Sequence, residues 1–434
     1  MKNLLLLFLV FNLHYSNLLY SQVFGQIDTT FNLNDTGDLF ANFNGKVNEI
    51  IAFPNGNYLV VGAFTEYNNI SVNRVVQLNN NGSIDQNFNI GTGANGEIKG
   101  VTQLQNGDLI LFGHFNDFNG HIVDSVVCLS TNGAVNLSFQ LNSSPITWIT
   151  DIVEESNGSL IISGSMTPFG FVGTAEYTII KTNPNGVVDN SYGFTSINSS
   201  INNIYIDSSN SIYIQGGFSS IQSYTRDNFA KIDTNGLIIP TYSPSLFNTF
   251  SSVRDVILEQ NGTAVICGTS LSNNTSGCIR LLPNGSIDPL FSSFQSWGHY
   301  TNICKDSFGR YYFLLDNNQI NSFYRLNNDG SLDSTFHTYF LQSTLENNTY
   351  NATIDPSGKL ILAKHNGIFR CLDNGALDPT LNLQNGANGS VDVVKTLPSG
   401  KILIGGEFTS FNGISLNGIG RLLHDVDLQY NSGH

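Results

Sequence analysis

A short phrase recurs eight times along this chain and constrains its fold more than any other feature. Each copy is a Gly-centred turn followed a few residues later by an aromatic residue or a leucine, and clear copies read NGSIDQNF, NGSIDPLF and DGSLDSTF. The turn glycines are Gly25, Gly82, Gly133, Gly186, Gly236, Gly285, Gly330 and Gly375. Successive glycines lie 45 to 57 residues apart. A period of this size indicates that one supersecondary unit is copied along the chain.

Each unit is predicted to consist of short β-strands. Apolar runs such as YLVV, LILF and KILI alternate with clusters of Asn, Gly, Ser and Asp, and no long stretch has helical periodicity. In the first unit we expect strands at residues 47–53, 57–64, 72–78 and 83–88, with tight turns before the second and the fourth. Asn and Gly tolerate the positive φ that two-residue hairpin turns need.

These features predict an all-β fold, an eight-bladed β-propeller of four-stranded antiparallel blades. Runs that are apolar on both faces suit sheets packed between neighbours. The chain begins with a fourth-strand phrase at Gly25, and its last unit ends after a third strand. We therefore expect the N-terminal strand to complete the last blade and to remove an open edge. A seven-bladed propeller and a β-solenoid are the alternatives.

The phrases resemble a known repeat family. Together with GTGANG at residues 91–96, ILIGGEFTSFNG at residues 402–413 and GIGRLL at residues 418–423, they are similar to the bacterial delta-60 repeat. That family consists of β-propeller-like repeats common in exported proteins, and the resemblance covers nearly all of the chain after its first residues. It implies a propeller fold and export, and it implies no particular activity.

The N-terminus has the features of a signal peptide. Lys2 precedes an apolar run at residues 4–10, and a cut after Ser21 would leave a small residue at the last signal position. The run is shorter than the roughly 20 residues that a transmembrane helix needs. We therefore expect residues 1–21 to be a signal peptide and residues 22–434 to form one repeat domain. The mature protein is expected to be secreted, extracellular, on the cell surface or periplasmic, with no membrane span.

Charge and local motifs argue against several ligand classes. A net charge of −15 with only 18 Lys and Arg argues against nucleic acid. Gly91, Gly93 and Gly96 have the GxGxxG spacing, but a strand rather than a helix is expected after them, so a dinucleotide is not predicted. The turn at residues 79–85 lacks the acid-rich opening and the bidentate Glu of a calcium loop. We expect neither a cofactor nor a metal.

A basic residue recurs just before the third-strand leucine. It occurs at Lys181, Lys231, Arg280, Arg325 and Arg421, and in several units an acid follows in the phrase. We interpret this column as structural ion pairs, and we expect Arg421 to pair with Asp28 across the two ends of the chain. Cys267 and Cys278 are predicted to lie in neighbouring strands, where they could form a disulfide or pack as small buried side chains.

The longer, more varied loops are the predicted binding face. These loops join the second strand to the third and each unit to the next, and both classes lie at the same end of the sheets. The residue before the terminal aromatic of the second strand varies between units and is expected beside the start of the first strand. Candidate ligand-binding residues from this column and the adjoining loops are His114, Trp148, Phe169, Phe171, Trp297, His299, Tyr300, Asp316, His365 and Glu407. Aromatic rings beside polar groups suit sugar or peptide recognition, although the Trp rings could equally pack between blades.

The function predicted from these features is binding. We expect a monomeric, exported binding or adhesion module for a glycan or an extracellular protein. No nucleophile–base–acid motif is evident in the sequence, and no catalytic residue is predicted. The alternative is a propeller-type glycan hydrolase or lyase with carboxylates and histidines at the channel mouth. A carboxylate pair about 5 to 9.5 Å apart would favour that alternative.

Overall fold

The computed structural model describes residues 25–32, 42–141, 144–166, 176–194, 197–244, 251–259, 261–269, 275–297, 299–316, 321–336, 349–364, 367–378 and 386–423. The predicted signal peptide lies outside these residues. The described residues form strands, turns and loops, without a helix, so the predicted all-β class is confirmed. They accordingly contain no helix that could span a membrane.

Eight antiparallel sheets of three or four strands follow one another along the described residues, and we number them sheets 1 to 8 in chain order. Their first strands are β1 (Val47–Ala52), β6 (Glu97–Gln103), β11 (Trp148–Glu154), β14 (Ile201–Ile206), β19 (Ser252–Leu258), β23 (His299–Lys305), β26 (Thr349–Ile354) and β29 (Val391–Thr396). Their middle strands are β2 (Tyr58–Gly62), β7 (Leu109–His114), β12 (Leu160–Ser165), β15 (Ile212–Gly216), β20 (Ala264–Thr269), β24 (Tyr311–Asp316), β27 (Leu360–Lys364) and β30 (Ile402–Gly406). Their third strands are β5 (Val75–Leu78), β10 (Val126–Leu129), β13 (Tyr177–Thr182), β18 (Phe229–Ile232), β21 (Thr275–Leu281), β25 (Asn321–Leu326), β28 (Gly367–Arg370) and β33 (Ile419–Leu422).

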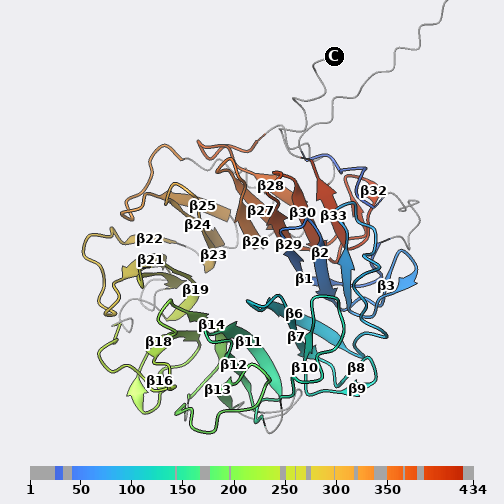
Figure 1. The fold of residues 1–434 in the computed structure, drawn as a ribbon. Coiled ribbons are helices and arrows are strands. Elements are labelled where there is room, and N and C mark those ends of the chain that lie inside the picture. Colours follow the sequence, from blue (N-terminus) through green and yellow to red (C-terminus); the bar gives the residue numbers. More distant parts are fainter. Residues whose placement is uncertain are drawn as a thin grey trace, which may run out of the picture.

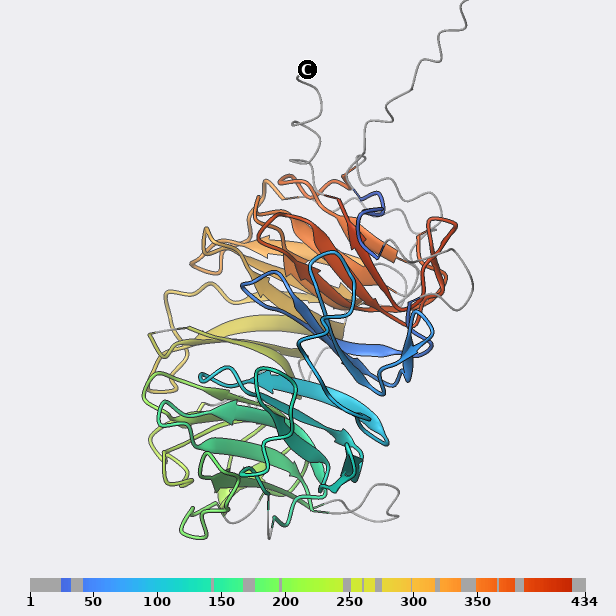
Figure 2. The same cartoon turned by 45° about the vertical axis from the view of Figure 1, so that its right-hand side comes forward.

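The sheets are arranged around a central opening, with the first strand of each sheet nearest to it (Figure 1). Small hairpins extend the loops between the middle and third strands of four sheets: β3 (Glu66–Tyr67) with β4 (Ile70–Ser71), β8 (Asp117–Phe118) with β9 (His121–Ile122), β16 (Ser220–Ile221) with β17 (Tyr224–Thr225), and β31 (Ser410–Phe411) with β32 (Ile414–Ser415). Figure 2 shows the same sheets stacked side by side from a turned view, with the last sheet beside the first.

Apolar packing joins each sheet to its neighbours. The middle strand β2 is buried along its whole length, as sheets covered on both faces require. Leu59 and Val61 of that strand pack against Ile98 and Leu111 of sheet 2. On the other face, Val60 belongs to a cluster that contains residues of sheet 8. The first and last sheets of the chain therefore share one hydrophobic cluster.

The prediction that the phrase forms a fourth strand is wrong. Within the described residues only sheet 5 has a fourth strand, β22 (Phe294–Trp297), and that strand follows the phrase. The phrase contributes a single bridging residue, as Ile84 does opposite Leu78 and Ile287 does opposite Leu281. The reason is a second turn directly after the bridge, because the Phe88 amide donates to the Asp85 carbonyl oxygen at 3.2 Å. The phrase is a turn–bridge–turn motif rather than a strand.

The turn glycine of a phrase contacts the preceding phrase in the chain. Gly82 has a φ of 82°, and a Cβ at this position would lie 2.7 Å from the Asn32 nitrogen, so a larger residue does not fit. The Asn32 amide donates to the Asn81 carbonyl oxygen at 2.7 Å. The same bond recurs from Asn89 to Asn132 at 2.8 Å and from Ser292 to Asp329 at 2.7 Å. The repeated phrase therefore ties one sheet to the next.

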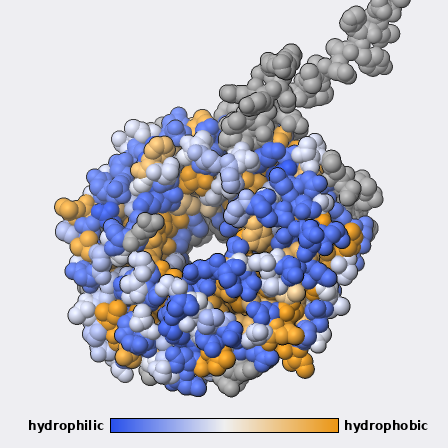
Figure 3. Space-filling model, viewed as in Figure 1, coloured by the Kyte–Doolittle hydropathy of each residue, from blue (hydrophilic) through white to orange (hydrophobic). Residues whose placement is uncertain are grey.

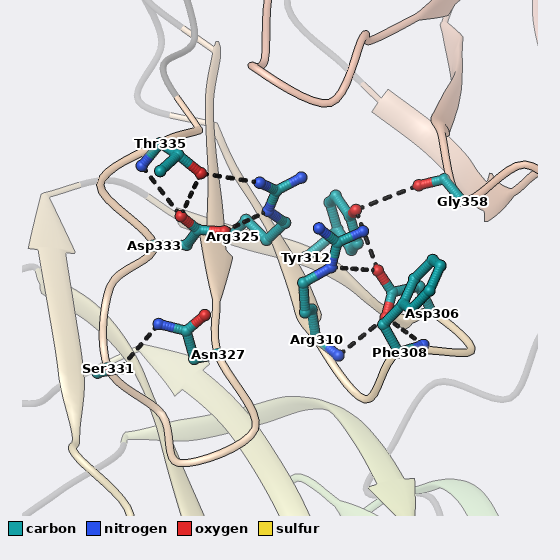
Figure 4. A network of polar contacts seen from close by, with 10 residues as sticks. All are labelled: Asp306, Phe308, Arg310, Tyr312, Arg325, Asn327, Ser331, Asp333, Thr335 and Gly358. Atoms are coloured by element: carbon teal, nitrogen blue, oxygen red, sulfur yellow. Dashed lines mark hydrogen bonds and ion pairs between the residues drawn. The ribbon is translucent and has the colours of Figure 1, made fainter.

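The basic column forms ion pairs with the acids of the phrase in the later units. Arginine and aspartate side chains pair at 2.7 Å in Arg280–Asp288 and Arg325–Asp333. Arg370, which the sequence analysis did not include in the column, pairs with Asp378 at 2.6 Å in the same way. Figure 4 shows the Arg325–Asp333 pair beside a second network in which the Tyr312 hydroxyl donates to Asp306 of its own sheet, at 3.2 Å, and to the Gly358 carbonyl of the next. Two lysines pair differently, because Lys181 contacts Glu155 at 2.6 Å and Lys231 contacts Asp207 at 2.9 Å.

The N-terminal segment Gly25–Asn32 binds the last strand of the chain. The Asp28 amide donates to the Arg421 carbonyl at 2.7 Å, and the Leu423 amide donates to the Gln26 carbonyl at 2.9 Å. The predicted pair between Arg421 Nε and Asp28 Oδ2 is confirmed at 2.8 Å. Arg421 Nη1 also reaches Asn80 Oδ1 of sheet 1 at 2.8 Å, so one guanidinium joins three segments.

We predict that Arg421→Ala lowers the free energy of unfolding by about 1–3 kcal/mol, because it leaves the buried Asp28 carboxylate without its arginine. Arg421 and Asp28 are 5% and 1% exposed. A double-mutant cycle with Asp28→Asn, measured by urea unfolding, should show coupling between the two positions. The control is Arg254→Ala, since the exposed Arg254 has no ion pair among the described residues. Independent, additive losses at Arg421 and Asp28 would contradict this account.

Candidate functional site

A β-bulge near the start of each first strand positions the variable column of the middle strand. In sheet 2 the bulge lies between Ile98 and Gly100, and His114 pairs with Glu97. Gly113 is required beside the bulge, because a Cβ there would collide with the backbone of Glu97 and Ile98. Bulge and glycine together bring the last residue of the middle strand against the entry of the first strand.

The predicted column is found where it was expected, beside the start of the first strand. The observed pairs include Glu97 with His114, Trp148 with Ser165, Ser252 with Thr269 and His299 with Asp316. In sheet 1 the register differs by one residue from the sequence-based expectation. Val47 pairs with Gly62, and the Ala63 amide donates to the Lys46 carbonyl at 2.8 Å, because the bulge adds a residue to the first strand.

An aromatic and charged cluster forms at the entries of sheets 2 and 3. The ring centroids of His114 and Trp148 are 4.0 Å apart in an edge-to-face arrangement. Glu97 lies between Lys99, whose Nζ is 2.8 Å from its carboxylate, and His114, whose Nδ1 is 3.9 Å away. Asn48 Nδ2 of the first sheet donates to Glu97 at 2.9 Å. The cluster therefore spans three consecutive sheets.

The titration of this cluster follows from its geometry. Burial, together with the Lys99 charge, lowers the pKa of His114 below its usual 6.5, and the Glu97 charge opposes them. Burial raises the pKa of Glu97, but hydrogen bonds from Lys99 and Asn48 and the charge of Lys99 outweigh it and lower that pKa overall. Near neutral pH the cluster therefore offers a neutral imidazole, a carboxylate and an ammonium group beside an indole ring.

A second charged group lies at the junction of sheets 8 and 1. Lys46 Nζ is 3.2 Å from Asp392 and 3.8 Å from Glu407, so one ammonium group touches both carboxylates. The Ser390 hydroxyl donates to Asp392 at 3.1 Å. Glu407 is the exposed member, with 57% of its side chain accessible.

We call the two groups together the mouth arc, because both lie where the first strands enter their sheets. Its residues are Lys46, Asn48, Glu97, Lys99, His114, Trp148, Asp392 and Glu407. Figure 3 shows that the central opening persists in the space-filling view and that hydrophilic residues border much of it.

The structure gathers three of the ten predicted site residues into this arc: His114, Trp148 and Glu407. Trp297 ends the fourth strand β22 opposite Thr275, rather than opening the next sheet as expected. His299 and Tyr300 begin β23, and Asp316 ends β24, at the corresponding positions of sheet 6. Phe169, Phe171 and His365 lie outside the described residues. Cys267 and Cys278 are directly opposed on adjacent strands and buried in the core of sheet 5.

Three carboxylates inside the channel were missed by the sequence analysis. Glu49, Asp151 and Asp255 follow the bulge in sheets 1, 3 and 5, and each accepts a backbone amide of the next sheet at 3.0 Å. The donors are Val101, Ile204 and Ile303, so these acids bind amides on first strands that have a sheet neighbour on one side only. The sequence did contain a signal for these three acids, because most units have an acid or an amide residue directly after the bulge. Aligned at the bulge, the residues are Glu49, Gly100, Asp151, Asn203, Asp255, Asn302, Asn351 and Val393.

Burial has a clear effect on these channel acids. It raises the pKa of Asp151 to about 6, against hydrogen bonds from Ile204 and Ile152 that lower it and with a further increase from the Glu49 charge. Burial likewise raises the pKa of Glu49 and of Asp255. These acids differ from Glu97, whose charge is stabilised by a lysine in direct contact.

We predict that His114 titrates below pH 6.5 and that its pKa depends on both charged neighbours. Lys99→Ala should raise the His114 pKa by removing a repelling charge, and Glu97→Gln should lower it further by removing an attracting one. Histidine ring resonances followed by NMR from pH 4 to 8 measure the direction of both shifts. Shifts of the opposite sign in both variants would show that the side chains are arranged differently.

Comparison with known proteins addresses the fold. A family model described as "Domain of unknown function (DUF5122) beta-propeller" matches residues 54–88, 259–291, 309–336 and 397–425. No curated protein matches the sequence. Each of the four matched segments begins at or just before the tight turn that precedes a middle strand, three of them end with a phrase, and the fourth ends just after β33.

Among solved structures, the Dos1 propeller is similar with a TM-score of 0.53 and 10% identity over 88% of this chain and 93% of that one. The extracellular domain of a one component system from B. thetaiotaomicron has a TM-score of 0.42 and 12% identity over 75% of this chain, which spans 38% of that domain. A gluconolactonase from Xanthomonas campestris has a TM-score of 0.36 and 12% identity over 76% of this chain and 96% of that one. The family model, the sheet arrangement and the likeness to the Dos1 propeller identify this chain as a β-propeller.

Proposed function

We propose that this protein is an exported β-propeller that binds a glycan at the mouth arc. The observation that carries the proposal is the His114–Trp148 ring pair beside Glu97, Lys99 and Asn48. Sugar rings present apolar C–H faces and outward hydroxyls, so they suit an aromatic ring with hydrogen-bonding groups at its edge. Both ring residues are only half-buried, which leaves part of the pair open to a ligand.

The position of the arc supports binding as well. The arc is placed by strand ends and bulges of a rigid scaffold, and varied loops surround it. A rigid platform reduces the ordering cost of binding. An extracellular protein that presents a similar surface is the alternative ligand. Secretion or surface location is part of this proposal, as are the signal peptide at residues 1–21, the single domain at residues 22–434 and the monomeric state.

The second candidate function is glycan hydrolysis or cleavage, and one observation favours it. Asp392 and Glu407 flank the same ammonium group at the mouth, as a pair of catalytic carboxylates would flank a scissile bond. A glycosidase needs one member of such a pair protonated. Lys46 instead compensates both negative charges, so the arrangement fits the orientation of a polar ligand better than general acid catalysis.

We further propose that the eight sheets are the eight blades of a closed ring and that the N-terminal segment closes it. Gly25–Asn32 contacts sheet 1 through the Asn32-to-Asn81 hydrogen bond and the close approach of Gly82, and the phrases of sheets 1, 2, 3 and 5 form the same bond with the sheet that follows. The shared cluster of Val47 and Ile50 with Val393 and Leu403 also supports closure. Delta-60 repeats, which the phrases resemble, would be the units of this ring.

The closure proposal predicts that Gly82→Ala and the deletion of Gln22 to Asn32 are not additive, because the deletion removes the Asn32 that a Cβ at Gly82 would meet. Each alone should lower the melting temperature, because each removes or displaces the closing segment. Added to the deletion, Gly82→Ala should cost only its backbone strain, about 1–2 kcal/mol. Gly120→Ala is the matched control, since Gly120 has a similar φ of 77° but nothing within 4 Å of a Cβ. Full thermal stability of the deletion protein would refute closure by this segment.

The binding proposal predicts that Trp148→Ala abolishes glycan binding and leaves the melting temperature within a few degrees, because a half-buried residue at a strand entry contributes little to the core. A glycan array on the secreted protein identifies a ligand, and calorimetry measures its affinity. The matched control is Asn328→Ala, on a tight turn at the opposite end of the sheets. Equal loss of binding in both variants would indicate general instability. Normal binding with a much lower melting temperature in Trp148→Ala would show that the ring serves packing.

A further inference from the structure

A hollow of about 770 Å³ lies in the channel wall, away from the mouth arc. Its apolar lining comes from Val153 of β11, Ile204, Tyr205 and Ile206 of β14, and Leu258 of β19. These three first strands lie side by side at the central opening (Figure 1). Because the lining continues to the ends of these strands, the hollow opens toward the tight-turn end of the channel.

The rim of the hollow carries two acids whose charges are already compensated. Asp207 and Glu259 line it, and each is held by a lysine. Lys231 Nζ lies 2.9 Å from Asp207, and Lys305 Nζ lies 2.6 Å from Glu259. These two acids therefore add little net charge to the site.

Two further acids lie on the same strands near the hollow, outside its described lining and without such a partner. Asp151 accepts the amide of Ile204, a lining residue, and Asp255 lies three residues before Leu258 on β19. Both use their oxygens for backbone amides, and within the described residues neither forms an ion pair with a lysine or arginine. Each carboxylate oxygen has a second lone pair, so both acids can accept further hydrogen bonds.

The negative charges of Asp151 and Asp255 act on their neighbours without a compensating cation among the described residues. Burial raises the pKa of Tyr205, and the charges of Asp255 and Asp151 raise it further, so both carboxylates act on the same ring of the lining. Burial also raises the pKa of Cys304, and Asp255 adds to that effect from the other side of β19. Glu49 is the remaining charged group that acts on Asp151, and it disfavours the ionised form.

We propose that this hollow binds a small organic ammonium compound, whose apolar body contacts Val153, Ile206 and Leu258 and whose charge is balanced by Asp151 and Asp255. The apolar floor supplies hydrophobic contact, and Tyr205 supplies an aromatic ring for a cation. This site is separate from the mouth arc in residues and in ligand chemistry, and it does not depend on the glycan proposal.

The proposal also determines how affinity changes with pH. A bound cation favours the ionised form of Asp151, whose pKa is about 6 in the unliganded protein. Binding should therefore release a proton below pH 6 and strengthen as the pH rises from 5 to about 7.5. None of the described residues that line the hollow is a histidine, which would produce the opposite trend.

Calorimetry with tyramine tests the proposal, and 4-ethylphenol, which has the same ring without the amine, serves as the neutral comparison. We expect tyramine to bind at pH 7.5 about tenfold more tightly than 4-ethylphenol and to weaken toward pH 5. Asp151→Asn and Asp255→Asn should each reduce tyramine affinity several-fold, and Asp151→Asn should flatten the pH dependence. Asp124→Asn, which changes the same charge on the exposed edge of sheet 2, should have no effect.

Ser208→Trp provides a test that leaves both acids in place. Ser208 is exposed at the edge of the hollow, so an indole there should fill the space and block tyramine without disturbing the core. Thermal melting of every variant distinguishes lost binding from lost folding. Equal affinity for tyramine and 4-ethylphenol, unchanged binding in Ser208→Trp, or no binding of tyramine at about 10 mM would each overturn the proposal.

Discussion

Neighbouring sheets are joined by a hydrogen bond that recurs along the described residues, from the amide that follows one phrase to the carbonyl before the next turn glycine. It occurs between Asn32 and Asn81 and again between Asn89 and Asn132. The bond requires a close approach that only glycine permits, since a Cβ at Gly133 would lie 2.9 Å from the Asn89 nitrogen. This contact fixes how closely the neighbouring phrases approach each other, and apolar packing between the same sheets accompanies it. The preserved Gly in the phrase is therefore explained by packing between units rather than by turn conformation alone.

Much of the fold could be predicted from the sequence because it follows from periodicity. The repeat, the all-β class, the Arg421–Asp28 pair and the position of the variable column each depend on a residue pattern that recurs. Periodicity wrongly predicted a fourth strand from the phrase, and the three-stranded form of most sheets could not be predicted in this way. Over three residues, a strand and a turn–bridge–turn motif show the same alternation of apolar and polar side chains. The turn forms because of local hydrogen bonds such as that from the Phe88 amide to the Asp85 carbonyl. The blade count and the closure of the ring depend on contacts between the chain ends, for which periodicity gives only an expectation.

The candidate sites were less predictable for a geometric reason. His114, Trp148 and Glu407 were found as variable residues at a constant position, whereas Lys46, Asn48 and Lys99 belong to strand entries whose alignment depends on the bulge. The bulge shifts the register by one residue and turns Glu49, Asp151 and Asp255 toward the backbone of the neighbouring sheet. The recurrence of acid and amide residues directly after the bulge signals the presence of these three acids in the sequence. It does not reveal that burial destabilises their charges, because burial is a property of the assembled channel.

The acids of the channel lie in two different electrostatic environments. The net charge of −15 alone does not reveal this difference. At the mouth, Lys46 and Lys99 lie within hydrogen-bonding or ion-pair distance of the acids, so that region is polar but nearly balanced. Deeper in the wall, backbone amides take the place of lysines around Asp151 and Asp255. An amide stabilises a carboxylate through a dipole and carries no net charge, so the negative potential there persists. Both environments lie beside the bulges of the first strands, and the difference between them follows from which partner, a lysine or a backbone amide, faces each acid.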